Sequence, residues 1–171
     1  MFDPEQMRGF VPDPVPMFMV GLVLMRPRST GRLAIATTDP TAQPTLTLNY
    51  LSDPSDMARM VAGWRLGRDL CRSGELAAMV GTLLIDDRVL DDDEAIGAVL
   101  REQITTTYHP AGTAPMGPPG DERSVVDARG RVHGVDGLRV VDASILPTSV
   151  RSNTNLTCVM VAERMASWMT A

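Results

Sequence analysis

The last predicted helix constrains the fold of this chain more than any other feature of the sequence. It covers about Thr154 to Met169, and its apolar residues are spread over nearly every side: Leu156, Val159, Met160, Val161, Ala162, Met165 and Trp168. A helix that is apolar nearly all round is normally buried on most sides. We therefore expect it to pack against a surface, such as a sheet, that these 171 residues do not encode.

The segment before residue 51 is expected to form strands. Residues 18–25 are continuously apolar, residues 32–37 follow the turn signal Ser-Thr-Gly, and residues 45–50 begin with alternating Thr and Leu. Such runs are typical of β-strands, and the Gly and Pro residues between them favour tight connections. An antiparallel meander of these three strands is therefore predicted.

Two helices are predicted after the strands. Asp53 is a good N-cap for the first, Pro54 fits its first position, Asp56 places a negative charge in its first turn, and Gly74 is expected to end it as the C′ residue. The second helix is expected from residue 92 or 93 to about 106. The residues that should face inward keep to helical spacing: Met57, Met60, Val61, Trp64 and Cys71 in the first helix, and Ile96, Val99, Leu100 and Ile104 in the second.

After Tyr108 the chain becomes rich in Gly and Pro, and two short strands are predicted at 124–126 and 138–141. The polar residues that do not look like surface residues stand at strand ends and helix starts: His109, Asp142, Asn153, Thr154 and Asn155. Ligands bind at such places in open α/β sheets, and a helix N-terminus offers unpaired N–H groups to an anionic or electron-accepting ligand. Each residue also has a structural alternative, because a histidine can simply stabilise a turn and Asp or Asn can act as a cap.

Three ordered stretches resolve these alternatives by resemblance. HPAGTAPMG at 109–117, SVVDARGRVHGVDGLRVVDASILPT at 124–148 and SNTNLTCVMVAERMASWM at 152–169 resemble the C-terminal signature of the glucose–methanol–choline oxidoreductases. These are FAD-dependent enzymes that oxidise alcohols. The stretch from Arg26 to Met60 is similar to the segment that opens the substrate-domain sheet of the family. The resemblance therefore covers roughly residues 16–170.

The resemblance implies a role for each candidate residue. His109 would be the base that accepts the hydroxyl proton of the substrate, because a neutral imidazole titrates near the working pH. Asn153 would donate a hydrogen bond to the substrate oxygen and orient it. The backbone at Thr154 and Asn155 would approach the pyrimidine ring of the flavin. Asp142 and Ala143 would contact the ribityl and pyrophosphate portion of FAD, whereas His133 would be structural.

The resemblance also implies the fold and its division into domains. It predicts an α+β chain, with an antiparallel sheet and flanking helices of a substrate domain in residues 1–108. Residues 109–171 would complete the active site and supply strand and helix elements of an FAD-binding α/β domain. The fingerprint G-x-G-x-x-G is absent, so the N-terminal Rossmann part of the FAD site is expected in a missing N-terminal region or a partner chain.

The expected function is therefore that of a C-terminal fragment of an FAD-dependent, choline dehydrogenase-like alcohol oxidoreductase, inactive as an isolated chain. The alternative is a non-catalytic remnant, or a subunit that completes a separately encoded FAD domain. A hydrolase based on Ser144, His109 and Asp142 is disfavoured because no serine lies in a G-x-S-x-G motif. The sequence specifies neither the alcohol nor the electron acceptor.

Composition excludes several other classes of function. The net charge of −5 argues against a nucleic-acid partner, and two distant histidines with no C-x-x-C motif argue against a metal site. The acidic run at 91–94 is typical of an exposed helix start. The longest apolar run, residues 17–25, is too short to span a membrane. Cys71 and Cys158 are expected to be buried free thiols, which favours a cytoplasmic location.

Overall fold

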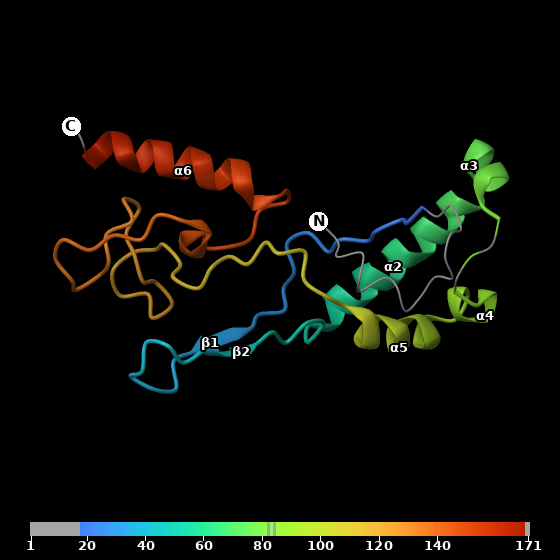
Figure 1. Ribbon diagram of the computed structural model, residues 1–171, viewed down its shortest axis with the longest axis horizontal. Coiled ribbons are helices and arrows are strands. Elements are labelled where there is room, and N and C mark those ends of the chain that lie inside the picture. Colours follow the sequence, from blue (N-terminus) through green and yellow to red (C-terminus); the bar gives the residue numbers. More distant parts are fainter. Residues whose placement is uncertain (1–17, 82, 84, 170–171) are drawn as a thin grey trace.

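A computed structural model describes residues 18–81, 83 and 85–169. Helices α2 to α5 lie on one side of the molecule, α6 and a long loop-rich segment lie on the other, and a small hairpin extends below that segment (Figure 1). We call residues 54–103 the helical region and residues 109–169 the signature region. The elements in chain order are β1 (Arg32–Ala34), β2 (Thr45–Thr47), α2 (Pro54–Cys71), α3 (Gly74–Met79), α4 (Asp87–Leu90), α5 (Asp93–Gln103), the 3₁₀ helix η1 (Ala143–Ile145) and α6 (Thr154–Met169).

Two of the three predicted strands pair with each other. β1 and β2 are antiparallel, with Leu33 opposite Leu46 in the centre of the pairing. Both strands are shorter than the predicted runs, and β2 ends early because residues after it leave the extended conformation. Asn49 has a φ of 50° and Leu51 a φ of 58°, and left-handed residues cannot continue a strand.

The prediction of a first strand at 18–25 is wrong. This segment has no regular secondary structure, and its backbone pairs with no strand in the described part of the chain. Its apolar residues serve another purpose, since Leu22 and Leu24 pack against the helical core while Val23 is exposed. A continuous apolar run shows that side chains are buried, but it does not show what the backbone pairs with.

The helical region is built around α2 and α5, as predicted. Asp53 caps α2 by accepting a hydrogen bond of 2.8 Å from the backbone N–H of Ser55, and Pro54 occupies the first position. The α2–α5 core joins Met60, Ile96 and Leu100 to partly buried neighbours: Leu22, Leu24, Leu51, Met57, Val61 and Trp64. Cys71 is buried at the end of α2, whereas Cys158 on α6 is half-buried rather than buried.

The ends of these helices differ from the prediction. α2 ends at Cys71 with Arg72 as its C-cap, whose N–H donates to the carbonyls of Arg68 and Asp69. Gly74 is therefore not the C′ residue; with a φ of 53° it begins the short helix α3, which the sequence did not indicate. α4 was not predicted either. α5 ends at Gln103 rather than near residue 106, since Ile104 is extended.

The start of α2 anchors the segment that precedes β1. The Asp56 side chain is fully buried and accepts hydrogen bonds from the backbone N–H groups of Arg28 and Ser29 at 2.8 and 2.7 Å. The Ser29 hydroxyl donates at 2.7 Å and Arg59 at 3.3 Å. Burial acts to raise the pKa of Asp56, but these hydrogen bonds and the Arg59 charge outweigh burial, so the pKa lies below 3.8. The sequence indicated only a favourable first-turn charge here.

The signature region contains neither of its two predicted strands. Segments 124–126 and 138–141 take part only in isolated bridges, which join Val126 to Met116 and Val132, and Arg131 to Arg139. Frequent turns explain the difference, since Gly130, Gly134 and Gly137 all have positive φ. A second core nevertheless forms from Val126, Ile145 and Met165.

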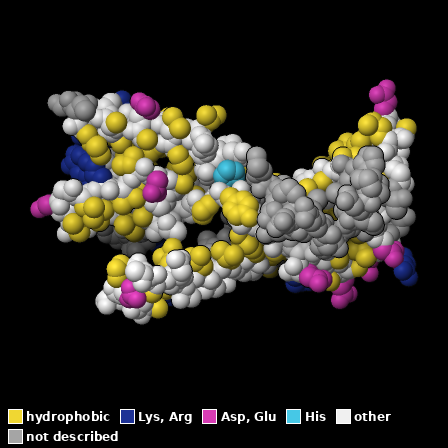
Figure 2. Space-filling view, viewed as in Figure 1, with side chains coloured by type: hydrophobic (Ala, Val, Ile, Leu, Met, Phe, Trp, Pro, Cys, Tyr) yellow, Lys and Arg dark blue, Asp and Glu magenta, His cyan; other side chains and the backbone are white. Residues whose placement is uncertain are grey.

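Helix α6 has the predicted bounds but is covered on one side only. Met165 is buried, and Val161 and Trp168 pack beside it against the loops. Leu156 is 82% exposed and Met160 58% exposed. Figure 2 shows hydrophobic side chains open to solvent over the part of the molecule that contains α6. The expected burial on most sides is therefore not reached within the described residues.

Candidate functional site

Three backbone hydrogen bonds bring together two parts of the signature that are 30 residues apart in the chain. They join the segment that follows His109 to the segment that follows Asp142: Gly112 N–H to Ala143 O at 3.2 Å, Ala114 N–H to Ser144 O at 2.9 Å, and Met116 N–H to Ile145 O at 2.8 Å. Gly112 is required at this junction. It has a φ of 78°, and a Cβ on it would lie 3.1 Å from the carbonyl oxygen of Leu146.

The same junction brings His109 to the start of α6. Its Nδ1 lies 3.1 Å from the hydroxyl oxygen of Thr154, which is the first residue of the helix and is buried. A proton on Nδ1 donates to this oxygen and leaves the lone pair of Nε2 available. Nε2 makes no hydrogen bond to any described residue. The half-buried ring is therefore held through Nδ1, and in the tautomer that carries its proton on Nδ1, Nε2 is the available acceptor.

The residue before His109 has an uncommon backbone conformation that the sequence did not indicate. Tyr108 has a φ of 61°, and its N–H donates to the Thr106 hydroxyl at 2.9 Å. A bulky residue with positive φ is disfavoured, and such residues concentrate at functional sites. No motif could have revealed this conformation, since tyrosine carries no preference for it.

The N-terminus of α6 presents unpaired donors. Among the described residues, no group accepts a hydrogen bond from the backbone N–H of Thr154, Asn155 or Leu156, and the side chains of Asn153 and Asn155 are exposed. A helix of 16 residues carries partial positive charge at this end. This end can therefore donate hydrogen bonds to an anionic or electron-rich ligand. The Asn153 amide makes no hydrogen bond within the described chain, so the structure brings Thr154 to His109 but gives no such contact for Asn153.

Asp142 is held as an ionised acceptor. Its Oδ1 accepts hydrogen bonds from the backbone N–H of Ser144 at 2.7 Å and from the Ser144 hydroxyl. The Ser144 hydroxyl and then its N–H lower the pKa of Asp142 below 3.8. Oδ2 makes no hydrogen bond to any described residue, and the Asp142 side chain is exposed. This Ser–Asp contact does not include His109, so the three residues do not form a hydrolase triad.

The second histidine has a different environment. Nε2 of His133 lies 3.0 Å from the Ser124 hydroxyl and 3.2 Å from the carbonyl oxygen of Gly117. These contacts join three turns of the signature region. This environment is compatible with the structural role that the resemblance implies for His133.

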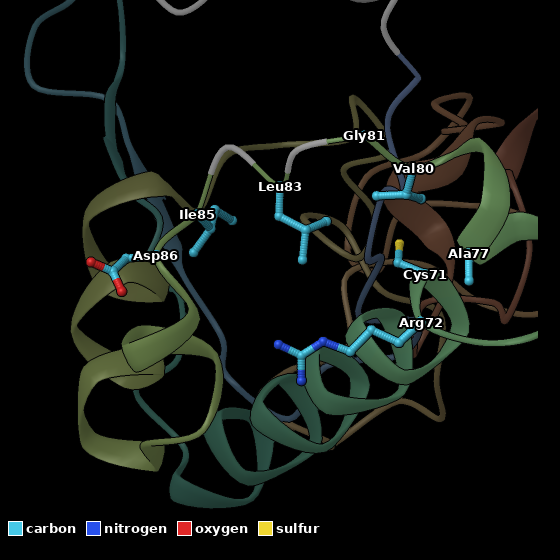
Figure 3. A pocket seen from close by; sticks show the side chains of 8 residues that line it. All are labelled: Cys71, Arg72, Ala77, Val80, Gly81, Leu83, Ile85 and Asp86. Carbon is cyan, nitrogen blue, oxygen red and sulfur yellow. The ribbon is translucent and has the colours of Figure 1, made fainter.

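Neither of two surface pockets coincides with the predicted site residues. One, of about 550 Å³, lies between the end of α2, α3 and the approach to α4, and Leu83, Arg72 and the buried Cys71 are among the residues that line it (Figure 3). The other, of about 600 Å³, is bounded by Arg26, Ser55 and Arg151 among others. The described residues contain no cluster of three His, Cys, Asp or Glu side chains able to hold a metal ion. No helix in the described ranges combines the length and hydropathy needed to cross a bilayer.

Comparison with known proteins shows which family the sequence of this chain matches. The GMC oxidoreductase family model matches residues 27–162. An oxygen-dependent choline dehydrogenase from Proteus mirabilis (strain HI4320) is 39% identical over 142 residues, which are 83% of this chain and 25% of that protein. A 5-(hydroxymethyl)furfural oxidase from Methylovorus sp. (strain MP688) is 41% identical over 154 residues, covering 82% of this chain and 29% of that protein.

Solved structures agree with the sequence relatives. A fungal aryl-alcohol oxidase superposes with a TM-score of 0.71 at 32% identity, over 85% of this chain and 25% of that one. An FAD-dependent oxidoreductase from Chaetomium thermophilum superposes with a TM-score of 0.77 at 29% identity, over 84% of this chain and 25% of that one. The chain spans about a quarter of the length of the curated relatives that it matches. With the family model covering residues 27–162 and the expected resemblance thus confirmed, this chain belongs to the GMC oxidoreductase family.

Proposed function

We propose that this chain supplies the substrate-side catalytic residues of an FAD-dependent oxidation of a small alcohol, in an enzyme similar to choline dehydrogenase. The observation that carries the proposal is the His109–Thr154 hydrogen bond of 3.1 Å. It attaches a titratable imidazole to the helix end whose unpaired donors fit a flavin. Membership of a family whose relatives are named for alcohol oxidation supports the same reaction.

His109 acts as the base in this proposal. Its free Nε2 accepts the hydroxyl proton of the alcohol, while Thr154 holds the ring in the tautomer that leaves Nε2 unprotonated. Asn153 cannot accept a proton at neutral pH, so its exposed amide donates a hydrogen bond to the substrate oxygen and orients it. When bound, FAD supplies the acceptor for the hydride that leaves the substrate carbon.

Four residues are proposed to hold the cofactor. The backbone N–H groups of Thr154 and Asn155 would face the electron-rich pyrimidine ring, where the partial positive charge of α6 is favourable. Asp142, through its unpaired Oδ2, and the adjacent Ala143 would contact the ribityl and pyrophosphate portion. These assignments follow the family resemblance, and the ionised state of Asp142 and the unpaired donors of α6 are compatible with them.

The chain is proposed to work as the C-terminal part of a longer enzyme. Three observations support this: the chain spans about a quarter of its relatives, it lacks G-x-G-x-x-G, and one side of α6 is apolar and exposed. Residues 1–108 would carry part of the substrate domain, and residues 109–171 would complete the active site and the FAD domain. The Rossmann portion of the FAD site would come from a preceding region.

Replacement of His109 tests the proposed mechanism. In the complete enzyme, His109→Ala is expected to slow flavin reduction by the alcohol roughly 10²–10⁴-fold, as for loss of a general base. Stopped-flow absorbance of the flavin measures this rate, with choline and 5-(hydroxymethyl)furfural as first substrates. His133→Gln is the matched control and should leave the rate of the folded enzyme nearly unchanged. Near-normal reduction in His109→Ala would overturn the role of His109.

Asn153→Ala separates substrate positioning from cofactor binding. We expect a smaller loss of rate than for His109→Ala, with the flavin content unchanged. Loss of flavin in this variant would make Asn153 a cofactor contact and contradict its assignment as the residue that orients the alcohol.

The alternative function is that of a separate subunit, or of a remnant without activity. It is supported by the missing Rossmann fingerprint. Flavin absorbance of the purified 171-residue chain tests the premise that all of these possibilities share, namely that the FAD site of the isolated chain is incomplete. We expect a colourless protein, and stoichiometric FAD would show that the cofactor site is complete without further sequence.

A further inference from the structure

Arginine residues gather in a pocket that the proposed reaction does not use. The pocket of about 600 Å³ is lined by the segment before β1, the start of α2 and the loop before α6. Four of its seven lining residues are arginines and two others carry hydroxyl groups: Arg26, Pro27, Arg28, Ser55, Arg59, Thr148 and Arg151. His109 and Thr154 are not among them.

Two of the arginines are held in place by the fold. Arg26 donates from Nε to the Thr148 hydroxyl at 3.3 Å, which joins the segment before β1 to the loop before α6. Arg59 donates to the carbonyls of Met25 and Arg26 at 2.6 and 3.2 Å and to Asp56 at 3.3 Å. These contacts fix the pocket walls without neutralising all of their positive charge.

The other two arginines are available for binding. The guanidinium groups of Arg28 and Arg151 make no hydrogen bond or ion pair with any described residue, and both side chains are exposed. Only the backbone N–H of Arg28 is engaged, with Asp56. Two guanidinium groups therefore border the pocket, and their N–H donors make no hydrogen bond to the described residues.

The nearby carboxylates do not balance the charge. Asp56 is buried beneath the pocket and occupied by Ser29, Arg28 and Arg59, and Asp53 is occupied as the cap of α2, although it lies close enough to interact with the Arg28 charge. Four positive charges thus meet two negative ones in a chain whose net charge is −5. Guanidinium groups recognise carboxylate and phosphate through paired N–H donors, and a bound anion would relieve their mutual repulsion.

We propose that this pocket binds an oxyanion, the phosphate or carboxylate group of a small molecule. Arg28 and Arg151 contact the anion directly, and Arg26 and Arg59 shape the pocket and add charge. A volume of about 600 Å³ accommodates a small molecule that carries such a group. The pocket is separate from the proposed base at His109, so the anion need not be the alcohol.

Titration of the full chain with inorganic phosphate tests the proposal. The Nε–H signals of arginine are followed by ¹H–¹⁵N NMR at constant ionic strength, with acetate and chloride titrated in parallel. We expect saturable shifts of pocket arginines with phosphate or acetate and none with chloride. The oxyanion that binds with the lower dissociation constant shows whether the pocket prefers phosphate or carboxylate. Absence of saturation with both oxyanions would overturn the proposal.

Two variants assign the binding to the pocket. Arg28→Gln combined with Arg151→Gln should weaken oxyanion binding roughly tenfold or more, because two charge-assisted contacts are lost. Neither guanidinium supports the fold, so the circular dichroism and melting temperature should not change. Arg123→Gln is the control, since Arg123 is exposed and pairs with Asp121 outside the pocket. An equal loss of affinity in the control would show non-specific charge attraction and refute the site.

Discussion

The helical region and the signature region each have a small buried core, but different interactions hold them together. In the first, Met60, Ile96 and Leu100 meet because two regular helices pack face to face. In the second, Val126, Ile145 and Met165 meet through isolated bridges, turns and one side of α6. Order in the helical region comes mainly from local periodicity, whereas order in the signature region depends on contacts between distant segments.

This difference explains why the region with little regular structure carries the recognisable motif. A helix face accepts any apolar residue of suitable size, so its sequence is loosely constrained. In the signature region, single positions are constrained by backbone geometry, as at Gly112, or by one hydrogen bond, as at Thr154. The proposed chemistry uses the more constrained region, where side chains from separate segments are brought together.

The largest expected effects come from removing the fully buried isoleucine of each core. Ile96→Ala and Ile145→Ala should each lower the free energy of unfolding by about 2–5 kcal/mol. We expect Ile96→Ala to cost more, because packed helices close a cavity less easily than loops do. Urea denaturation measures both values, and Ile35→Ala, at a side chain 81% exposed, should change stability by less than about 0.5 kcal/mol.

A reversed ranking of the two losses in unfolding free energy would change the comparison between the helical region and the signature region. A larger loss for Ile145→Ala than for Ile96→Ala would mean that the loops of the signature region are packed more rigidly than the helices. Hydrogen exchange of the two variants would then show loss of protection spreading from Ile145 into the helical region.

An intermediate effect is expected from the buried carboxylate of the helical region. Asp56→Ala leaves the N–H groups of Arg28 and Ser29 without their acceptor, which should cost about 2–3 kcal/mol. Asp93→Ala is the matched control, because Asp93 lies in the first turn of α5 but is exposed and pairs with Arg65. Thermal unfolding should show a small change in the control, less than about 1 kcal/mol. Equal losses of stability would mean that the buried hydrogen bonds of Asp56 contribute nothing beyond the effect of its negative charge in the first turn of α2.

The same carboxylate predicts a pH dependence. The pKa of Asp56 in the folded chain lies below its ordinary value of 3.8. The stability that it contributes is therefore complete above the unfolded pKa and is lost as the pH falls through the folded pKa. Asp56→Ala should show a weaker decline of melting temperature below pH 4 than the parent chain. An unchanged acid decline would assign the effect to other depressed carboxyls, such as Asp86, whose pKa is about 2.

The smallest effects separate backbone conformation from packing in the signature region. Gly130 and Gly134 have φ values of 71° and 75°, but only Gly130 is enclosed, since a Cβ on it would lie 2.6 Å from the Val140 carbonyl oxygen and 2.8 Å from Sδ of Met165. Gly134→Ala should cost about 1 kcal/mol from conformation alone, and Gly130→Ala about 1–3 kcal/mol. Chemical denaturation compares them. Equal costs would show that both the Val140 carbonyl and the Met165 side chain move away from Gly130 without penalty.

Much of the helical region could be predicted from the sequence, because its information is local. The cap at Asp53, the first position at Pro54 and the inward face of α2 follow from spacing of a few residues. The strand predicted at 18–25 was wrong, since an apolar run does not reveal whether its backbone has a partner strand. The helix end predicted at Gly74 was wrong as well, because α2 ends at Cys71 and the left-handed Gly74 begins α3 instead.

For the candidate site, the sequence by itself determined the family, the residue types and their order, since these are properties of the chain alone. Only the tertiary structure decided that Thr154 bonds to His109, that Tyr108 is left-handed and that Asp56 is buried. The His109–Thr154 pair joins residues 45 positions apart, and Asp56 meets Ser29 across 27 positions. Local periodicity carries no information at such separations, because the distance between the groups depends on how every intervening turn and core contact folds the chain.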